Sequence, residues 1–229
     1  PHSLKKHSDW RRLRNPRHVT LKNPMPDFQL ESNLTGRIAG IDEAGLGPWA
    51  GPVSAAAVVL DQANLPDALR DGLDDSKKLS PRARDALFDA LHEQARLGNV
   101  DIGVGLSSVA EIERNNILAA TMTAMARAVT DLDRPVDIAL VDGNRVPNLT
   151  CTVQTVVKGD QRSLSIAAAS IIAKVTRDWI MAELDAQHPG YGWAHNAGYG
   201  TAEHRAALLQ LGVTPHHRRS FKPIAALLK

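Results

Sequence analysis

GIDEAGLGPWAGP, residues 40–52, places two acids, Asp42 and Glu43, side by side among four glycines and two prolines. RIAGID at 37–42, which runs into this stretch, predicts a short strand, and VSAAAVVL at 53–60 predicts a second strand directly after it. Adjacent negative charges repel each other and glycine disfavours regular structure, so stability alone does not explain this stretch. We interpret it as the end of a strand that carries a functional site.

Outside this stretch the sequence alternates between helix and strand patterns. Ser80, followed by proline, is typical of a helix start, and apolar residues then recur at helical spacing. Ser108 and Glu111 form a capping-box pattern before one long helix that we expect to reach about Leu132. Further strands are predicted at 100–106, 136–141 and 152–157, and further helices at 165–184 and 201–211. Strands interspersed with helices predict an α/β domain around one sheet.

Composition limits the class of protein. The 229 residues include 43% hydrophobic and 23% charged ones, which is ordinary for a globular protein with its own core. Cys151 is the single cysteine, so an internal disulfide is excluded and a reducing compartment is favoured. No apolar run reaches transmembrane length and no signal-peptide pattern is present, so we expect a soluble, cytoplasmic protein.

The net charge of +2 is unevenly distributed. Residues 1–36 hold seven Lys or Arg against three Asp or Glu, and residues 195–229 hold five against one. The middle, 37–194, holds fifteen against twenty-one. Basic ends around an acidic middle are typical of a protein that binds a polyanion with its ends and acts on it with the middle of the chain. A solvated tail and an ordinary charged surface give the same pattern. We predict a flexible basic extension over 1–36 and a catalytic domain over 37–229.

Four acids fall at or just after predicted strand ends, each within two residues of a glycine. Asp42 and Glu43 end one strand, Asp142 ends a second, and Asp160 follows a third. Active sites collect at such strand ends, and clustered carboxylates repel unless a cation lies between them. Hard oxygen donors favour Mg²⁺ or Mn²⁺, and two such ions are a common means of hydrolysing a phosphodiester.

Strand geometry leaves one alternative open. Neighbours in a regular strand point to opposite faces, so Asp42 and Glu43 serve one site only if the strand breaks, and Ala44–Gly45 offers that break. Otherwise the four acids are separate turn and cap residues. Asp178 competes with Asp160 by residue type, but it lies within a predicted helix, where a solvated or salt-bridged acid is expected.

Seven sequence blocks together resemble the motif series of bacterial ribonuclease HII. They are GIDEAGLGPWAGPV, DSKKLS, NNILAATMTAMARAV, VDGN, VVKGDQRSLSIAAASIIAKVTRD, YGWAHNAGYGTAEH and HHRRSF. They occur in the family's order from about residue 37 to residue 222, which is nearly the whole chain apart from the extension. One such block would be weak support, whereas seven in order are specific.

The resemblance implies a ribonuclease H-like fold with a mixed central sheet, flanking helices and a C-terminal helical segment. It implies an endonuclease that cuts RNA, or a single ribonucleotide, within a duplex with DNA, as in ribonucleotide excision repair. Cleavage 5′ of the ribonucleotide would leave 3′-hydroxyl and 5′-phosphate ends. By motif, Asp42, Glu43 and Asp142 would be the metal ligands and Asp160 the fourth catalytic carboxylate, in a two-ion mechanism with Mg²⁺ or Mn²⁺.

The same resemblance implies the residues that bind the duplex. The family has Gly-Arg-Gly after the acids, and its main chain packs against the 2′-hydroxyl, the group that distinguishes RNA from DNA. This chain has Gly45–Leu46–Gly47, so the arginine is missing. Tyr199 matches a tyrosine that stacks on a sugar, and Lys77 and Lys78 match residues near the nucleic-acid backbone. The basic run 216–219 suggests a phosphate-facing patch.

Two other functions remain open. Ribonuclease HIII is a related enzyme that acts mainly on long hybrids, but its extra N-terminal substrate-binding domain is larger than residues 1–36. A catalytically inactive protein that binds RNA–DNA duplexes is the alternative of another class, although all four acids are present. We expect a monomer without membrane contact, and the sequence does not identify a protein partner.

Overall fold

The computed structural model describes residues 25–228. Five strands form one mixed sheet in the order β3-β2-β1-β4-β5, as the sequence predicts for an α/β domain. The strands are β1 (Ile38–Ala44), β2 (Val53–Leu60), β3 (Val100–Ser107), β4 (Ile138–Asp142) and β5 (Thr152–Val156). β1 pairs antiparallel with β2 and parallel with β4, so the carboxyl ends of β1 and β4 meet at one edge.

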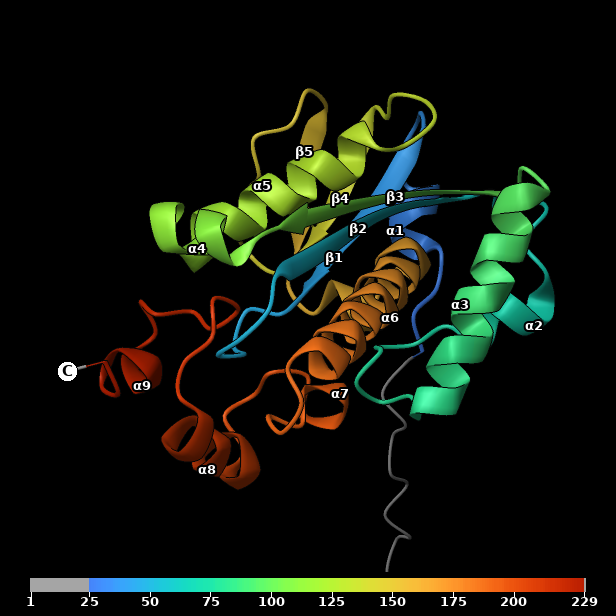
Figure 1. The fold of residues 1–229 in the computed structure, drawn as a ribbon. Helices are drawn as coiled ribbons and strands as arrows, with labels where there is room; N and C mark the ends of the chain where they lie inside the picture. Colours follow the sequence, from blue (N-terminus) through green and yellow to red (C-terminus); the bar gives the residue numbers. More distant parts are fainter. Residues whose placement is uncertain (1–24, 229) are drawn as a thin grey trace, which may run out of the picture.

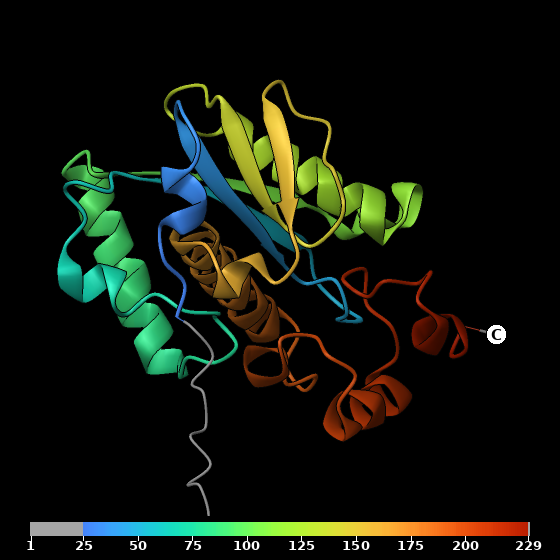
Figure 2. The same ribbon diagram turned by 180° about the vertical axis from the view of Figure 1, so that it is seen from behind.

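Helices cover both faces of the sheet (Figures 1 and 2). α4 (Val109–Asn115) and α5 (Ile117–Thr130) lie on one side, and α3 (Pro81–Arg96) and α6 (Leu164–Gln187) lie on the other. Successive side chains of β2 point to opposite faces of the sheet and so enter different layers. Ala56 packs with α3 and α6, whereas Ala55 and Ala57 pack with α5. The short helices are α1 (Gln29–Ser32), α2 (Asp67–Arg70), η1 (Gly159–Gln161), α7 (Trp193–Asn196), α8 (Ala202–Leu211) and α9 (Lys222–Ala225).

The predicted long helix after Ser108 is wrong in one respect, because it is two helices. The capping box forms as expected, but the chain breaks at Asn116, which has a φ of 67°. The Asn116 side chain then starts α5, since its oxygen accepts hydrogen bonds from the N–H groups of Leu118 (3.0 Å) and Ala119 (3.1 Å). Asparagine tolerates a positive φ better than most residues, which explains why the break comes there.

α6 lies unusually close to the sheet. A Cβ atom at Gly40 in β1 would overlap the backbone of Ser165 and Ile166, so only glycine fits at this crossing. The surrounding layers are built from small residues that are fully buried, namely Ala55, Ala56, Ala57, Ala167, Ala168 and Ala169. This contact brings the start of α6, and the turn just before it, against the strand that carries the two adjacent acids.

Residues 25–36, which the sequence assigns to the extension, pack on the domain in this structure. Glu31 in α1 is buried, and its carboxylate accepts hydrogen bonds from the Ser163 hydroxyl (2.6 Å) and the Ser165 N–H (3.0 Å). The packed part of the chain therefore begins before residue 37. The seven basic residues of the predicted extension lie within 1–24, outside the described residues.

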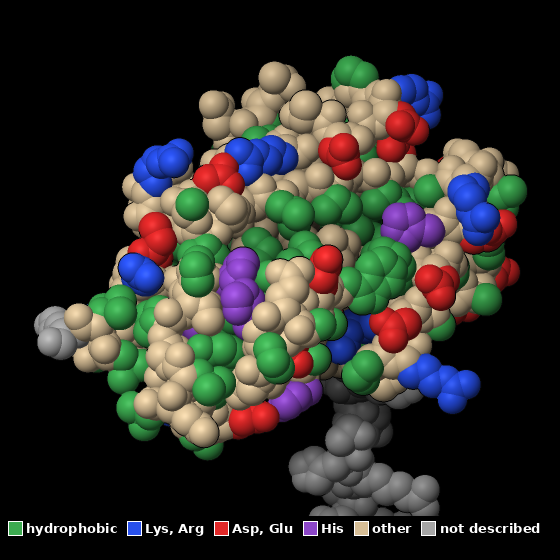
Figure 3. Space-filling view, viewed as in Figure 1, with side chains coloured by type: hydrophobic (Ala, Val, Ile, Leu, Met, Phe, Trp, Pro, Cys, Tyr) green, Lys and Arg blue, Asp and Glu red, His purple; other side chains and the backbone are tan. Residues whose placement is uncertain are grey.

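The C-terminal part forms a small module beside the sheet edge. α7, α8 and α9 gather around the fully buried Trp193, next to Met181 of α6. On the face drawn in Figure 3, Lys and Arg side chains are interspersed with Asp and Glu side chains. Within residues 25–228, no helix is both long enough and apolar enough to cross a membrane.

Candidate active site

Three of the predicted acids lie near the carboxyl ends of β1 and β4, where their charges act on one another. Ile41 and Val141 pair in parallel register, so the next residues, Asp42 and Asp142, lie side by side on the face that α6 covers. The Gly159 N–H donates to Asp142 Oδ1 (2.6 Å), which ties the start of η1 to this strand end. η1 carries Asp160, so a turn far along the sequence brings the third acid to the same edge.

Burial and mutual repulsion disfavour the charged forms of these acids. Burial, followed by the charges of Glu43 and Asp142, raises the pKa of Asp42 well above its usual value. Burial and then Asp142 raise the pKa of Glu43 to about 7. The pKa of Asp160 rises to about 6, first through burial and then through the charges of Asp75 and Asp142. The edge therefore carries negative charge that the protein compensates only in part.

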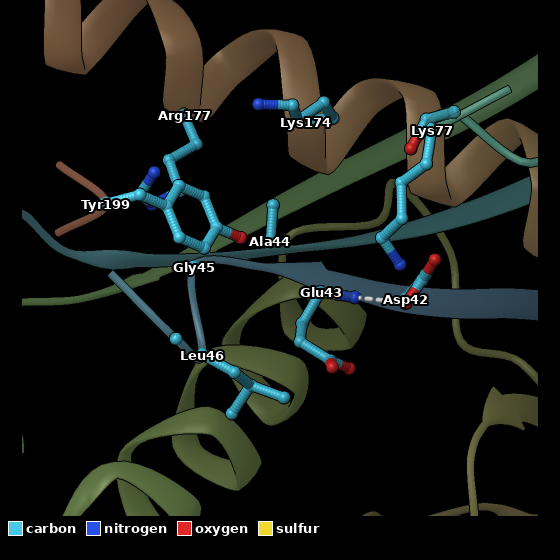
Figure 4. Close-up of a pocket in the computed structure, with 11 residues that line it drawn as sticks. Asp42, Glu43, Ala44, Gly45, Leu46, Lys77, Lys174, Arg177 and Tyr199 are labelled. Carbon is cyan, nitrogen blue, oxygen red and sulfur yellow. Dashed lines mark hydrogen bonds between the residues drawn. The ribbon is translucent and has the colours of Figure 1, made fainter. Parts of the chain in front are cut away.

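Glu43 lies on the other face of β1 from Asp42. The strand continues to Ala44, and the break expected at Ala44–Gly45 comes only at Gly45, whose φ is 108°. Asp42 pairs with Ala56 on the α6 side and Glu43 pairs with Ala55 on the α5 side, so the two carboxylates point apart (Figure 4). In the described part of the chain, no three His, Cys, Asp or Glu side chains converge as a preformed metal site.

The donor set nevertheless fits a hard divalent cation. All four predicted acids offer oxygen donors, and three of them have pKa values raised by burial as the largest cause, with repulsion from neighbouring acids adding to it. A cation placed among them would lower those pKa values and remove the repulsion. Asp178 does not take part, because Lys174 Nζ pairs with its Oδ1 at 2.6 Å, as expected of a salt-bridged helix acid.

Lys77 supplies part of the missing positive charge. Its side chain points toward Asp42 in Figure 4. Partial burial alone would lower the pKa of Lys77, but the Asp carboxylates around it, Asp42 first, raise that pKa. Asp75 is the residue that sequence reasoning missed here: it is buried, it accepts the Lys77 N–H (2.9 Å), and its charge acts on Asp160. The only signal for it is the second acid in DDSKKLS.

A pocket of about 310 Å³ opens beside the acids. It is lined by residues 42–47, Ser76, Lys77, Lys174, Arg177 and Tyr199. Tyr199 is 49% exposed and Leu46 is 38% exposed, so both side chains are open to a bound molecule. A Cβ on Gly47 would lie 3.4 Å from the Tyr199 ring, so ring and backbone form adjacent walls. Lys78 is not part of this lining, because it pairs with Asp74 (2.9 Å) at the surface.

Two buried arginines hold the loop between β1 and β2. Arg177 donates to the carbonyls of Pro52 (2.9 Å), Ala197 (2.8 Å) and Ala50 (3.0 Å). Burial lowers the pKa of Arg177 to about 10, and burial together with the Arg177 charge lowers the pKa of Arg218 to about 9. Both values leave the guanidinium groups protonated at neutral pH. The predicted phosphate-facing patch at 216–219 is therefore wrong for Arg218, which is fully buried, and for its neighbour His217, which is also buried.

Comparison with known proteins assigns the chain to a family. The sequence profile of the family described as Ribonuclease HII matches residues 39–224. The chain is 59% identical to ribonuclease HII of Rhodospirillum rubrum over 204 residues, which cover 89% of this chain and 92% of the relative. It is 58% identical to ribonuclease HII of Paramagnetospirillum magneticum over 201 residues, covering 88% and 98%.

The chain belongs to the ribonuclease HII family. Its fold agrees, because the crystal structure of ribonuclease H2 from Pyrococcus horikoshii superimposes with a TM-score of 0.67 at 29% identity. That match covers 83% of this chain and 96% of the other. As a member of the ribonuclease HII family the protein is a ribonuclease H, a hydrolase and endonuclease that acts on RNA–DNA substrates.

Proposed function

We propose that this ribonuclease H hydrolyses the phosphodiester 5′ of a ribonucleotide in duplex with DNA, including a single ribonucleotide embedded in DNA. The products would be 3′-hydroxyl and 5′-phosphate ends, and the reaction would depend on Mg²⁺ or Mn²⁺. One observation carries the proposal: Asp42 and Glu43, both with raised pKa values, line a pocket that also contains lysines, an arginine and an exposed tyrosine.

The acids divide into two roles in this proposal. Asp42, Glu43 and Asp142 would hold the cation, and Asp160 would be the fourth catalytic carboxylate. A pair of divalent cations would supply an activated water and stabilise the charge that develops on the departing 3′-oxygen. Because Glu43 starts on the opposite face of β1, it would reach the shared site around the strand end, next to the turn at Gly45.

The pocket walls supply the proposed contacts with the duplex. The exposed backbone at Leu46 and Gly47 would lie against the 2′-hydroxyl, and the exposed ring of Tyr199 would stack on a sugar. Lys77 would face the nucleic-acid backbone from the opposite wall. Lys78, although predicted from the same motif, lies outside the pocket and would contact only the periphery of a bound duplex.

The deciding experiment measures cleavage and binding separately in Asp142→Asn. This change keeps the shape of the side chain and its place beside Gly159 but removes a charge, so Mg²⁺-dependent cleavage should fall by several orders of magnitude while duplex binding persists. Asp85→Asn is the matched control, because Asp85 is exposed on α3, away from the pocket. Turnover of Asp142→Asn at the rate of the unaltered protein would remove Asp142 from the site.

The substrates used in that assay separate the alternatives. A duplex with one embedded ribonucleotide, a long RNA–DNA hybrid and an all-DNA duplex are each incubated with Mg²⁺ and with EDTA. Cleavage confined to the long hybrid would favour activity of the ribonuclease HIII type. Binding without any turnover by the unaltered protein would identify a duplex-binding protein that has lost catalysis.

A further inference from the structure

Arg218 is fully buried between the C-terminal segment and the loop that follows β1. Its guanidinium donates to the carbonyls of Gly51 (3.0 Å), Leu46 (3.1 Å) and Pro52 (3.2 Å). No carboxylate of residues 25–228 pairs with it. A buried charge without an acid partner is costly. The hydrogen bonds to three carbonyls of one loop compensate for it, together with the Phe221 ring, whose centroid lies 5.2 Å from the guanidinium carbon.

The bond to Leu46 fixes the direction of one peptide group. The C=O and N–H of a trans peptide point in opposite directions, and the described chain has no cis peptide. Because the Leu46 carbonyl faces the buried guanidinium, the Gly47 N–H faces away from it, toward the exposed side. Gly47 is exposed, lines the pocket beside Tyr199, and its N–H makes no hydrogen bond within residues 25–228. A free donor is therefore held at the pocket wall.

The rest of the loop has a second, independent anchor. The backbone N–H of Arg218 donates to the Trp49 carbonyl (2.7 Å), and the backbone N–H of Gly51 donates to the His216 carbonyl (2.9 Å). These backbone bonds surround an isolated bridge between Ala50 and the C-terminal segment. Shortening the Arg218 side chain would thus leave residues 49–51 in place and would release mainly the Leu46 end of the loop.

We propose that Arg218 is a positioning residue for recognition of the ribose. By holding the Leu46 carbonyl inward, it presents the Gly47 N–H to the 2′-hydroxyl of the ribonucleotide. The 2′-hydroxyl can accept this hydrogen bond, and deoxyribose cannot, so the bond contributes to binding only when RNA is present. This inference rests on the proposed function, in which the same loop contacts the ribonucleotide.

Arg177 provides a matched comparison within the same loop. It is also buried and also donates to three backbone carbonyls, two of them from Ala50 and Pro52, but it does not reach Leu46. A lysine at either position keeps the charge and loses the fork of donors that contacts several carbonyls at once. Arg218→Lys and Arg177→Lys therefore loosen the same loop, and only the first releases the Leu46 carbonyl.

The test measures the affinity ratio between a duplex with one ribonucleotide and an all-DNA duplex of the same sequence. All variants are made in the Asp142→Asn protein, so that substrate is bound without being cleaved. We expect Arg218→Lys to reduce the preference for the ribonucleotide about two- to tenfold, which corresponds to one neutral hydrogen bond. Arg177→Lys should weaken binding of both duplexes in proportion and keep the ratio.

Two outcomes would overturn the inference. The ratio could stay unchanged in Arg218→Lys, or it could fall equally in both lysine variants, which would indicate general loosening of the loop. If the Asp142→Asn parent itself binds both duplexes equally, the result refutes the proposed function and this inference with it. If the parent prefers the ribonucleotide duplex and Arg218→Lys keeps that preference, the result refutes this inference alone.

A second measurement leaves Arg218 unaltered and so does not depend on whether the lysine variant folds. In the Asp142→Asn protein labelled with ¹⁵N-glycine, the Gly47 amide resonance should shift when the ribonucleotide duplex is added. The all-DNA duplex should leave it largely in place. Equal shifts with both duplexes would show that the Gly47 N–H does not distinguish the sugars.

Discussion

Replacing Glu43 by glutamine should stabilise the metal-free protein above neutral pH while it abolishes cleavage. Burial and then the Asp142 charge raise the pKa of Glu43 from 4.5 to about 7. A carboxyl whose pKa is higher in the folded state binds its proton more tightly there than in the unfolded chain. The free energy of unfolding therefore decreases as the pH rises from about 4.5 to about 7, and glutamine removes this loss because it does not ionise.

The size of the effect follows from the pKa shift. One pKa unit corresponds to about 1.4 kcal/mol, so the whole shift sets an upper limit of roughly 3 kcal/mol. Glu43 is only partly buried, so solvent screens part of this cost, and we expect about 1–2 kcal/mol from the single substitution. In a domain of this size each kcal/mol moves the melting temperature by about 2–4 °C, which predicts a rise of roughly 2–8 °C.

The assay is thermal unfolding followed by circular dichroism in EDTA, at about pH 7.5 and again at about pH 5. The gain should be present at the higher pH and largely absent at the lower one. Glu183→Gln is the control, because Glu183 is exposed on α6 and should show no gain at either pH. Added Mg²⁺ should narrow the gap at the higher pH, since a cation bound at the site stabilises only the protein that keeps its acid.

A Glu43→Gln protein that melts at or below the parent at both pH values would refute this reasoning. It would mean that burial and the neighbouring acids do not raise the pKa of Glu43 as described. A gain of equal size at both pH values would point to improved packing of the amide rather than to relief of charge.

Three other substitutions test other parts of the structure. Tyr199→Ala should lower kcat/KM on the single-ribonucleotide duplex more than on a long hybrid, and leave the melting temperature nearly unchanged because the ring is 49% exposed. Glu31→Ala should cost roughly 2–4 kcal/mol in urea unfolding, because it leaves the buried Ser163 hydroxyl and a helix N–H without their acceptor. Leu46→Arg should raise kcat/KM about tenfold at low salt through a charged contact with phosphate, and a gain that persists at high salt would contradict that origin.

Local signals predicted most of the fold. Ser80 accepts a hydrogen bond from the Ala83 N–H (3.2 Å) at the start of α3, and the Ser108 capping box starts α4, as the sequence indicates. These features depend on neighbouring residues alone, so they can be recognised without the tertiary structure. The break at Asn116 could not, because the apolar spacing continues across it and only a positive φ separates the two helices.

The site was predictable where it depended on strand ends and not where it depended on packing. Acids at strand ends predicted a site at one edge of the sheet, and the parallel pairing of β1 with β4 places Asp42 and Asp142 side by side there. Asp75 and Arg218 acquire their places only in the folded chain, one beside Asp160 and the other under the loop after β1. A basic residue near the end of a chain suggests the surface, and nothing local shows that carbonyls far away in the sequence will bury it.

The close contact of α6 with β1 at Gly40 determines which core substitutions this enzyme can tolerate. In a core built on large side chains, the damaging changes are truncations that leave cavities. Here the buried positions at 55–57 and 167–169 are alanines, so truncation can remove only a methyl group. Larger side chains at these positions would overpack the core and destabilise the fold. In a saturation library we expect enlarging substitutions at these positions to disappear first. Sequence drift should therefore be slowest where the side chains are smallest, because there the backbone itself is the packing surface.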